Sequence, residues 1–442
     1  MIVREFKNEL KNEIINYVDE IFNIKEVDKI SFFTKGIRKK MLNFGAKLLE
    51  GWYENNIGTG YQGTKINIVK DGKEEELTFI DNLSKTYTTC LGDISIKRSY
   101  YFKKENSYIP LEEKYPYLKD SFFPEIKEMS CLVSCIDPYG IASDLLNRIG
   151  GIKVSAASLE RITKEIGGEL AKDEDNKTEN ILENRDKVER SNKIEDIIVI
   201  SADGAHIKID KEWKEVKSGA VYGITKDVSS DEIRAVNKSY ISRVENCHDF
   251  GKRIYLESLK RNVDKSKRVI TIGDGARWIW DQFDLHFPNS IQVIDWYHAT
   301  EHLYNIASLI YKDDDNEKKD FEKELKDNLY EGNIHNFKKL VISKIEDKKI
   351  KEGCNKYKQI EVENNYFMKN IEKMQYKDFE SKGYPIGSGV IEGACKNLVQ
   401  IRMKRNGMNW SNEGAHAVLQ LRCLYLSDRW NEVEEYTEQK RA

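Results

Sequence analysis

The pattern of apolar and polar positions changes several times along the chain. Over residues 1–60, apolar side chains such as Leu10, Ile14 and Val18 recur at three- and four-residue steps between charged ones, which is typical of amphipathic helices. Over residues 64–103, short apolar runs flank the turn pairs Asp71-Gly72 and Gly92-Asp93, which is typical of β-hairpins. The pattern therefore predicts an α+β region over residues 1–118, with helices followed by a small antiparallel sheet.

Residues 119–171 return to helical spacing, interrupted at the glycine pair Gly150-Gly151. From 142 to 170 the pattern predicts two helices with a glycine turn between them and Ser155 or Ser158 capping the second. This segment is a candidate helix-turn-helix for DNA binding. An ordinary helical hairpin is the alternative, because no base-reading side chains can be singled out.

Residues 172–195 are almost wholly polar and of mixed charge, and they predict a charged linker, with a solvated helix as the alternative. Beyond them, β-branched runs alternate with helical segments, which predicts an α/β domain with mixed strand pairing over residues 196–430. Within it, the Lys- and Glu-rich residues 311–380 predict an all-helical insertion. Residues 431–442 are expected to form a charged tail.

Composition excludes several classes of protein. No stretch approaches the roughly 20 uncharged apolar residues that a membrane helix needs, and the first residues lack the apolar run of a signal peptide. Seven scattered cysteines in 442 residues indicate reduced thiols and a cytoplasmic protein. The net charge of −3 gives no global signature of nucleic-acid binding, so any such surface must come from local asymmetry.

Three carboxylates stand in short glycine-rich motifs. Asp203 and Asp274 each precede a glycine at the expected end of a strand, and Glu392 lies in the segment Gly387-Ser388-Gly389-Val390-Ile391-Glu392-Gly393. Ligands gather at the carboxyl ends of strands in α/β sheets, and carboxylates within about 4 Å of each other need cations between them. The motifs therefore predict two Mg²⁺ or Mn²⁺ ions serving in-line attack at a phosphodiester, with the glycines admitting the phosphate backbone. For each aspartate alone, a turn residue is the alternative.

A second constellation follows at Asp295 and His298. Asp295 also ends an apolar strand and so competes with Asp274 as the second metal ligand. His298 and His302 are four residues apart, which could suit zinc, but a third ligand is not evident and the H-E-x-x-H order is absent. An accessory histidine that orients the substrate is the favoured interpretation.

A local excess of positive charge follows Glu392. From 394 to 422 there are five basic residues and one acidic residue, Glu413, with Trp410 among them. Such a patch suits a phosphate backbone, and a tryptophan beside arginine could stack on an unpaired base. A solvated helix face is the alternative. The candidate DNA-binding residues are Lys396, Arg402, Lys404, Arg405 and Trp410, with Arg422 nearby.

Several of these motifs, in this order, resemble the ISKra family of bacterial insertion-sequence transposases. The resemblance covers roughly residues 196–430. It rests on the segments 273–280, 287–288, 294–303, 384–396, 402–410 and 421–422. It implies an RNase H-like DDE core with a helical insertion, and a catalytic triad of Asp203, Asp274 and Glu392. Asp295 and His298 match an accessory D-x-x-H element of related transposases.

The resemblance also implies double-stranded DNA as partner. The substrates would be the element's terminal repeats and the target DNA, and the protein would act as a homo-oligomer on DNA, without a membrane, in the bacterial cytoplasm. Residues 1–170 match the family only loosely, and the hairpin-like segment 142–170 ahead of a polar linker leads us to expect that they bind the terminal repeats. Two alternatives stay open, namely an inactive DNA-binding descendant, against which the intact triad argues, and a metal-dependent nuclease without strand transfer.

Overall fold

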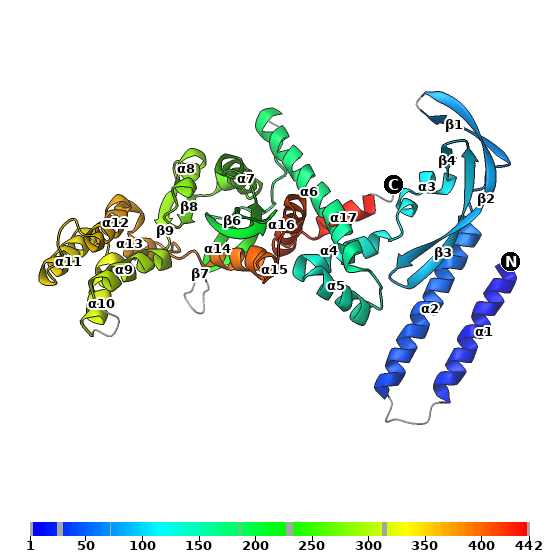
Figure 1. Cartoon of the computed structure of the whole chain (residues 1–442), viewed down its shortest axis with the longest axis horizontal. Helices are drawn as coiled ribbons and strands as arrows, with labels where there is room; N and C mark the ends of the chain where they lie inside the picture. Colours follow the sequence, from blue (N-terminus) through cyan, green and yellow to red (C-terminus); the bar gives the residue numbers. More distant parts are fainter. Residues whose placement is uncertain are drawn as a thin grey trace. The chain divides into compact units, whose positions relative to one another are not determined.

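A computed structural model of the chain describes residues 3–23, 30–70, 72–184, 187–226, 233–311 and 316–439. Figure 1 shows its helices and strands, coloured along the sequence. The chain divides into two compact units. The first comprises Met1–Ile166 and Trp430–Ala442, and the second comprises Gly167–Arg429. The division falls inside one long helix, α6 (Ala156–Asn184), rather than in a linker.

Unit 1 begins with two helices and an antiparallel sheet, as the pattern predicts. The helices are α1 (Val3–Phe22) and α2 (Ile30–Asn56). The sheet has the order β1-β2-β3-β4, and its strands are Lys65–Lys70, Lys73–Thr89, Gly92–Lys103 and Asn106–Tyr108. Both predicted hairpins share β2, which pairs with β1 on one side and β3 on the other. Of the first turn pair, Asp71 lies outside the described residues.

The second half of unit 1 is helical. Its elements are α3 (Pro110–Lys114), η2 (Pro116–Lys119), α4 (Pro124–Ile136), α5 (Tyr139–Leu145), a π-helical turn η3 (Leu146–Gly150) and the start of α6. The predicted glycine turn is present, since Gly151 has a φ of +75°. The Ser155 hydroxyl accepts the Ser158 N–H at 3.1 Å, as expected of a cap. Whether these helices bind DNA stays a prediction.

The predicted C-terminal tail is wrong over residues 431–439. These residues form α17 (Asn431–Gln439), which packs against α4 within unit 1. Val433 is fully buried, and the indole N–H of Trp430 donates to Glu128 at 2.5 Å. This segment is rich in acidic residues, but it forms an amphipathic helix whose few apolar side chains lie on the face that packs against α4.

The predicted charged linker is also wrong over residues 172–184, which continue α6. Their acidic side chains form ion pairs with basic residues within unit 2: Glu174 pairs with Lys260 at 2.7 Å, and Asp175 pairs with Arg253 at 2.8 Å. Thr178 is buried on the same helix. Of the described residues in this run, those from 187 to 195 are irregular, so its first part is a helix docked through ion pairs.

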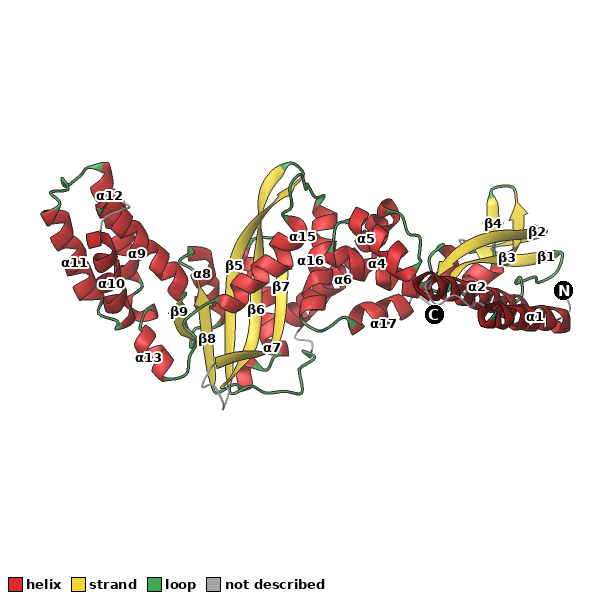
Figure 2. Ribbon diagram, turned by 90° about the horizontal axis from the view of Figure 1, so that it is seen from below, coloured by secondary structure: helices red, strands yellow, loops and turns green. Residues whose placement is uncertain are grey.

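The core of unit 2 is a five-stranded mixed sheet with the order β7-β6-β5-β8-β9 (Figure 2). Its strands, in chain order, are Ile197–Ile209, Glu212–Lys226, Ile233–Arg243, Arg268–Gly273 and Ile291–Ile294. The strands β5, β6 and β7 form an antiparallel meander, while β8 and β9 run parallel to β5. The predicted mixed α/β arrangement is therefore confirmed.

Helices cover both faces of this sheet. On one face lie α7 (Cys247–Lys260), the short η4 (Val263–Lys265) and α8 (Arg277–His286). They come so close that a Cβ on Gly219 or Gly273 would lie 2.8 Å from Ile254 or Ile279. The other face carries α14 (Gly389–Ala394), the π-helical η6 (Cys395–Gln400), α15 (Ile401–Met403) and α16 (Asn412–Leu426).

Between β9 and α14, each element that the structure describes is helical. These elements are α9 (Trp296–Ile310), α10 (Asn316–Tyr330), α11 (Ile334–Asp347), α12 (Asn355–Lys369), η5 (Ile371–Lys373) and α13 (Tyr376–Ser381). Buried Phe321, Leu325, Phe337 and Phe367 continue the apolar core of unit 2 through them. In the described part of the chain, no helix is long and apolar enough to cross a bilayer.

Candidate active site

The register of the parallel strands places three aspartates in a row. Ala202 of β5 pairs with Gly273 of β8, which pairs with Ile294 of β9. The residues that follow these three along the chain are Asp203, Asp274 and Asp295. Neighbouring strands lie about 4.8 Å apart, so Asp274 is the middle member, adjacent to both of the others.

Asp203 differs from the prediction in one respect, because it does not end its strand. The strand β5 continues to Ile209, closed onto β6 by Asp210 and Lys211, whose φ values of 50° and 70° suit a tight hairpin turn. What ends at Ala202 is the pairing with β8. The carboxylate therefore does stand where the parallel part of the sheet stops.

Glu392 lies in the first turn of α14, a helix held to the sheet on both sides of it. Before it, the backbone N–H of Ser388 donates to Oδ2 of Asp295. After it, the buried thiol of Cys395 is hydrogen-bonded to Asp203. These two contacts fix the helix that carries Glu392 relative to the strands that carry the aspartates.

Asp274 and Asp295 are used differently by the fold. Asp295 is 2% exposed and both its oxygens are engaged: Oδ1 caps α9 by accepting the His298 N–H at 2.7 Å, and Oδ2 accepts the Ser388 N–H. Asp274 is only partly buried, and it accepts one backbone N–H, from Ala276 at 2.8 Å. Asp274 thus has more capacity left for an external ligand.

The electrostatics of this edge are unbalanced. Burial raises the pKa of Asp203, and the nearby charge of Asp274 raises it further. The Cys395 thiol, the Gly204 N–H and His298 lower it, but by less than the total rise. Burial also raises the pKa of Glu392, as do the charges of Asp295 and Asp203. Within the described residues, no lysine or arginine forms an ion pair with any of these four carboxylates. The edge therefore holds concentrated negative charge that no described lysine or arginine pairs with.

The two histidines of α9 are held by different neighbours. His298 is partly exposed, with its Nδ1 3.6 Å from the Glu301 carboxylate. His302 is bound through Nδ1 to Glu363 at 2.5 Å, and its ring stacks on Tyr366 with centroids 3.9 Å apart. This second network comes from α12, and nothing in the sequence pattern of that Lys- and Glu-rich helix distinguished Glu363 or Tyr366.

Tyr366 also corrects the predicted role of one glycine. A Cβ on Gly275 would lie 2.5 Å from the Tyr366 ring, so the space above Gly275 is filled by protein rather than open to a phosphate backbone. Gly389 and Gly393, by contrast, have open space beside them. Among the described residues, no three His, Cys, Asp or Glu side chains converge closely enough to hold a metal ion, and this includes the zinc alternative at His298 and His302.

The predicted DNA-binding set divides into buried and exposed members. Arg402 is 1% exposed and stacks on Trp410, whose indole N–H donates to Met403 O at 3.0 Å. Arg422 is buried as well, donating to Leu398 O at 2.6 Å. The prediction that Arg402 and Trp410 contact DNA is therefore wrong, because both side chains are used in packing. The side chains of Lys396 and Lys404 are exposed, and that of Arg405 is half-buried.

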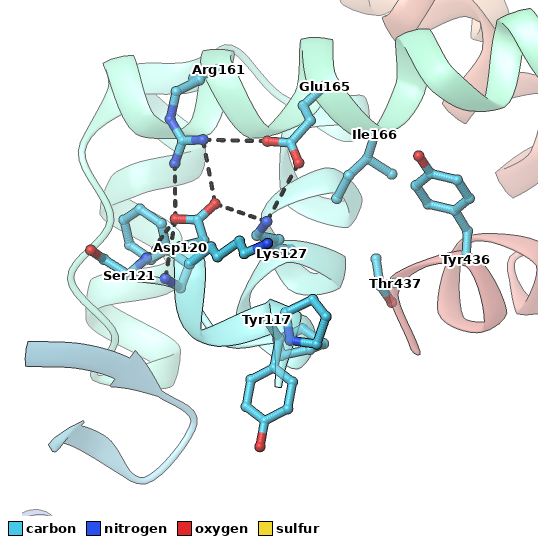
Figure 3. A pocket seen from close by; sticks show the side chains of 13 residues that line it. Tyr117, Asp120, Ser121, Lys127, Arg161, Glu165, Ile166, Tyr436 and Thr437 are labelled. Carbon is cyan, nitrogen blue, oxygen red and sulfur yellow. Dashed lines mark hydrogen bonds and ion pairs between the residues drawn. The ribbon is translucent and has the colours of Figure 1, made fainter. Parts of the chain in front are cut away.

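Unit 1 contains a cavity of about 620 Å³ that none of the sequence motifs indicated (Figure 3). Its charged lining is an ion-pair network, in which Lys127 contacts Asp120 at 2.8 Å and Glu165 at 3.5 Å, and Arg161 contacts the same two acids. These four charges satisfy one another, and the fifth charged residue of the lining, Lys119, pairs with Glu113 at 3.7 Å. This cavity therefore offers no unbalanced group for chemistry. The sheet edge of unit 2 remains the stronger candidate for an active site.

The chain belongs to the family described as uncharacterised protein family UPF0236, whose model matches residues 65–440. The match includes every candidate site residue named above. This family is associated with transposase-like proteins. A comparison with curated proteins gives no match.

Proposed function

We propose that this protein is an insertion-sequence transposase of the DDE type, which cleaves and joins DNA with divalent cations at Asp203, Asp274 and Glu392. The observation that carries the proposal is the sheet edge itself. Two aspartates on adjacent parallel strands and a glutamate clamped beside them lack any lysine or arginine partner in the described part of the chain. Uncompensated carboxylates at such a position favour an external cation as their counter-charge.

The topology supports an RNase H-like core. An antiparallel meander of three strands whose first strand lies centrally, followed by two parallel strands on its other side, is the arrangement expected of that fold. Helices α9 to α13 come between the last strand and the helix that carries Glu392, where the resemblance to ISKra transposases places an insertion. The association of the family with transposase-like proteins agrees with this interpretation.

The donor chemistry fits magnesium or manganese. Both ions prefer oxygen ligands, and the three residues offer only carboxylate oxygens. Two such cations, when bound, supply activation of the attacking oxygen and stabilisation of the leaving oxygen. The chain's own residues would hold and orient them: Asp203 and Asp274 from the sheet, and Glu392 from α14. Since the three side chains do not converge on one point in this structure, binding of the ions would have to draw their carboxylates together.

Asp295 has a supporting role in this proposal rather than that of the second ligand. Its two oxygens are occupied by the N–H groups of His298 and Ser388, and it thereby sets the position of the loop leading to Glu392. His298 stands on the same helix, partly exposed, and would orient the substrate. Double-stranded DNA is the proposed partner, bound at the element's ends with the help of unit 1, by a homo-oligomer in the bacterial cytoplasm.

The test is magnesium-dependent cleavage of a labelled duplex taken from the ends of the encoding element. Asp203→Asn, Asp274→Asn and Glu392→Gln should each abolish cleavage while leaving DNA binding intact. Asp281→Asn is the matched control, because Asp281 is an exposed aspartate of α8 outside the edge. Cleavage at the parental rate by all three variants would refute the site.

A second assay separates the alternatives. A transposase should join the cleaved ends to a target plasmid, whereas a nuclease would only cleave them. An inactive DNA-binding descendant would bind the ends and do neither.

A further inference from the structure

The tip of the β5–β6 hairpin and residues 404–410 form one surface, although they are about 200 residues apart in sequence. The Trp410 N–H donates to Lys208 O at 2.9 Å, and Trp410 O accepts the Asp210 N–H at 2.9 Å. The Lys211 N–H donates to the side-chain oxygen of Asn409 at 2.7 Å. These main-chain bonds extend the hairpin by a third segment and make a rigid platform, here called the hairpin surface (residues 208–214 and 404–409).

The hairpin surface exposes a tryptophan. Trp213 is 62% exposed, and the Lys404 ammonium lies 5.8 Å from the centre of its ring. The buried pair of Arg402 and Trp410 flanks residues 404–409 on both sides and anchors them. An aromatic ring left largely in water beside a cation is a contact surface for a partner that is apolar in part and anionic in part.

The charge of this surface is positive, in contrast to the slightly acidic chain. The residues that form it include five cations against two acids, Asp210 and Glu212. Because opposite residues on paired strands share a face, Lys208 lies on the side of Trp213, whereas Lys214, opposite Ile207, lies on the other side. None of its lysines forms an ion pair with a carboxylate in the described residues. The nearest further acid, Glu215, is already paired with Lys217 at 2.5 Å. The cations are Lys208, Lys211, Lys214, Lys404 and Arg405.

The distance of this surface from the proposed catalytic edge is set by one strand. Asp203 and Ile209 are six residues apart on β5, which corresponds to roughly 20 Å at about 3.3 Å per residue. In B-form DNA, about 3.4 Å per base pair, the same length is about six base pairs. A duplex cleaved at Asp203 and following β5 would pass the hairpin surface at that separation.

We propose that the hairpin surface binds the phosphate and deoxyribose backbone of the DNA substrate about six base pairs from the cleaved phosphodiester. This inference rests on the proposed function. Lys211 and Lys404 bind phosphates, and Trp213 packs against the sugars between them. The surface positions the duplex and reads no sequence, since backbone contacts carry no base information.

The experiment uses the full chain and a 40-base-pair duplex with the element's end in its middle. The dissociation constant is measured over a range of salt concentrations for the parent, for the double variant Lys211→Gln with Lys404→Gln, and for Trp213→Ala. The matched control is Lys319→Gln with Lys323→Gln, two exposed lysines of α10. Thermal melting establishes that all variants are folded.

The double variant should lower the slope of log affinity against log salt by about two, at about 0.9 per lost phosphate contact, and the control should leave it unchanged. Trp213→Ala should weaken binding about tenfold at constant slope. Ethylation of phosphates about six base pairs from the cleavage site should interfere with binding by the parent and not by the double variant.

The outcomes separate the two proposals. If the parent binds no DNA, the proposed function fails and this inference fails with it. If the parent binds and cleaves DNA but the double variant keeps its slope and its interference pattern, the hairpin surface does not contact DNA. That second result would point to an acidic protein segment as its partner, while the proposed function would stand.

Discussion

Two acidic regions of unit 2 differ in whether their carboxylates form ion pairs. Where α6 meets α7, the acids are paired with cations, as in the 2.7 Å pair of Glu174 with Lys260. Burial alone would raise the pKa of Glu174, but Lys260, with Arg429 and Arg243 nearby, outweighs it and lowers the pKa to about 2. At the sheet edge, Asp203 and Glu392 have raised pKa values and no lysine or arginine partner among the described residues.

The presence or absence of a cationic partner distinguishes carboxylates that stabilise the fold from carboxylates that are available to bind a ligand. Replacing an acid of the first kind removes half of an ion pair and leaves a cation without its partner. Replacing one of the second kind relieves repulsion and removes a binding oxygen. Asp295 is an intermediate case, because backbone N–H groups rather than cations satisfy it. The following experiments test this distinction, in order of decreasing effect.

Asp274→Asn should show the largest effect, and only on activity. We expect magnesium-dependent cleavage to fall at least a thousandfold, about 4 kcal/mol of transition-state stabilisation. The melting temperature without metal should be unchanged or slightly higher, because Asn still accepts the Ala276 N–H and no longer repels Asp203. A clear loss of thermal stability would show that the Asp274 carboxylate stabilises the fold rather than binding a ligand.

Glu174→Gln should show the reverse pattern, with a loss of stability and cleavage spared. The shift of the pKa from 4.5 to about 2 corresponds to about 3 kcal/mol at pH 7. Because the folded-state pKa is lowered, this stability is fully present above pH 4.5 and is lost as the pH falls toward 2. Urea unfolding of parent and variant at pH 7, 4.5 and 3 measures it.

The two unfolding curves should therefore converge as the pH decreases. Glu169→Gln, which breaks an exposed ion pair with Lys172 on the same helix, is the control and should cost less than 1 kcal/mol. A constant gap between parent and Glu174→Gln from pH 7 to 3 would mean that the ion pair with Lys260 does not stabilise the fold.

Asp295→Ala should cost about 2 kcal/mol of folding stability, because α9 loses its cap and the Ser388 N–H loses its acceptor. Cleavage should fall too, since the loop before Glu392 is no longer held. Asp295→Asn keeps an oxygen for the cap and should recover part of the stability. If Asp295→Asn is stable and inactive while Asp274→Asn cleaves normally, Asp295 is the second ligand and the assignment must be reversed.

Cys395→Ala should have the smallest effect. It removes the hydrogen bond between the thiol and Asp203, worth about 1 kcal/mol, and should lower cleavage severalfold when magnesium is limiting. Cys395→Ser keeps a donor and should restore the dependence of the rate on magnesium concentration. Equal behaviour of the two variants across a magnesium titration would show that the thiol does not position Asp203.

The local pattern of the sequence determined most elements of secondary structure. Apolar periodicity and turn residues placed the hairpins of unit 1, the strands of the central sheet and the cap at Ser155, because these depend on neighbouring residues along the chain. The same pattern placed Asp274 and Asp295 after strands. It could not say which one lies beside Asp203.

The tertiary structure decided which side chains are available for chemistry. Strand order and register put Asp274 in the middle of the row and gave both oxygens of Asp295 to backbone N–H groups. Distant packing buried Arg402 against Trp410, left Trp213 exposed, and docked the charged run at 172–184 as a helix through ion pairs. A polar residue looks the same in sequence whether it faces water or a partner two hundred residues away, so burial and charge compensation are properties of the fold.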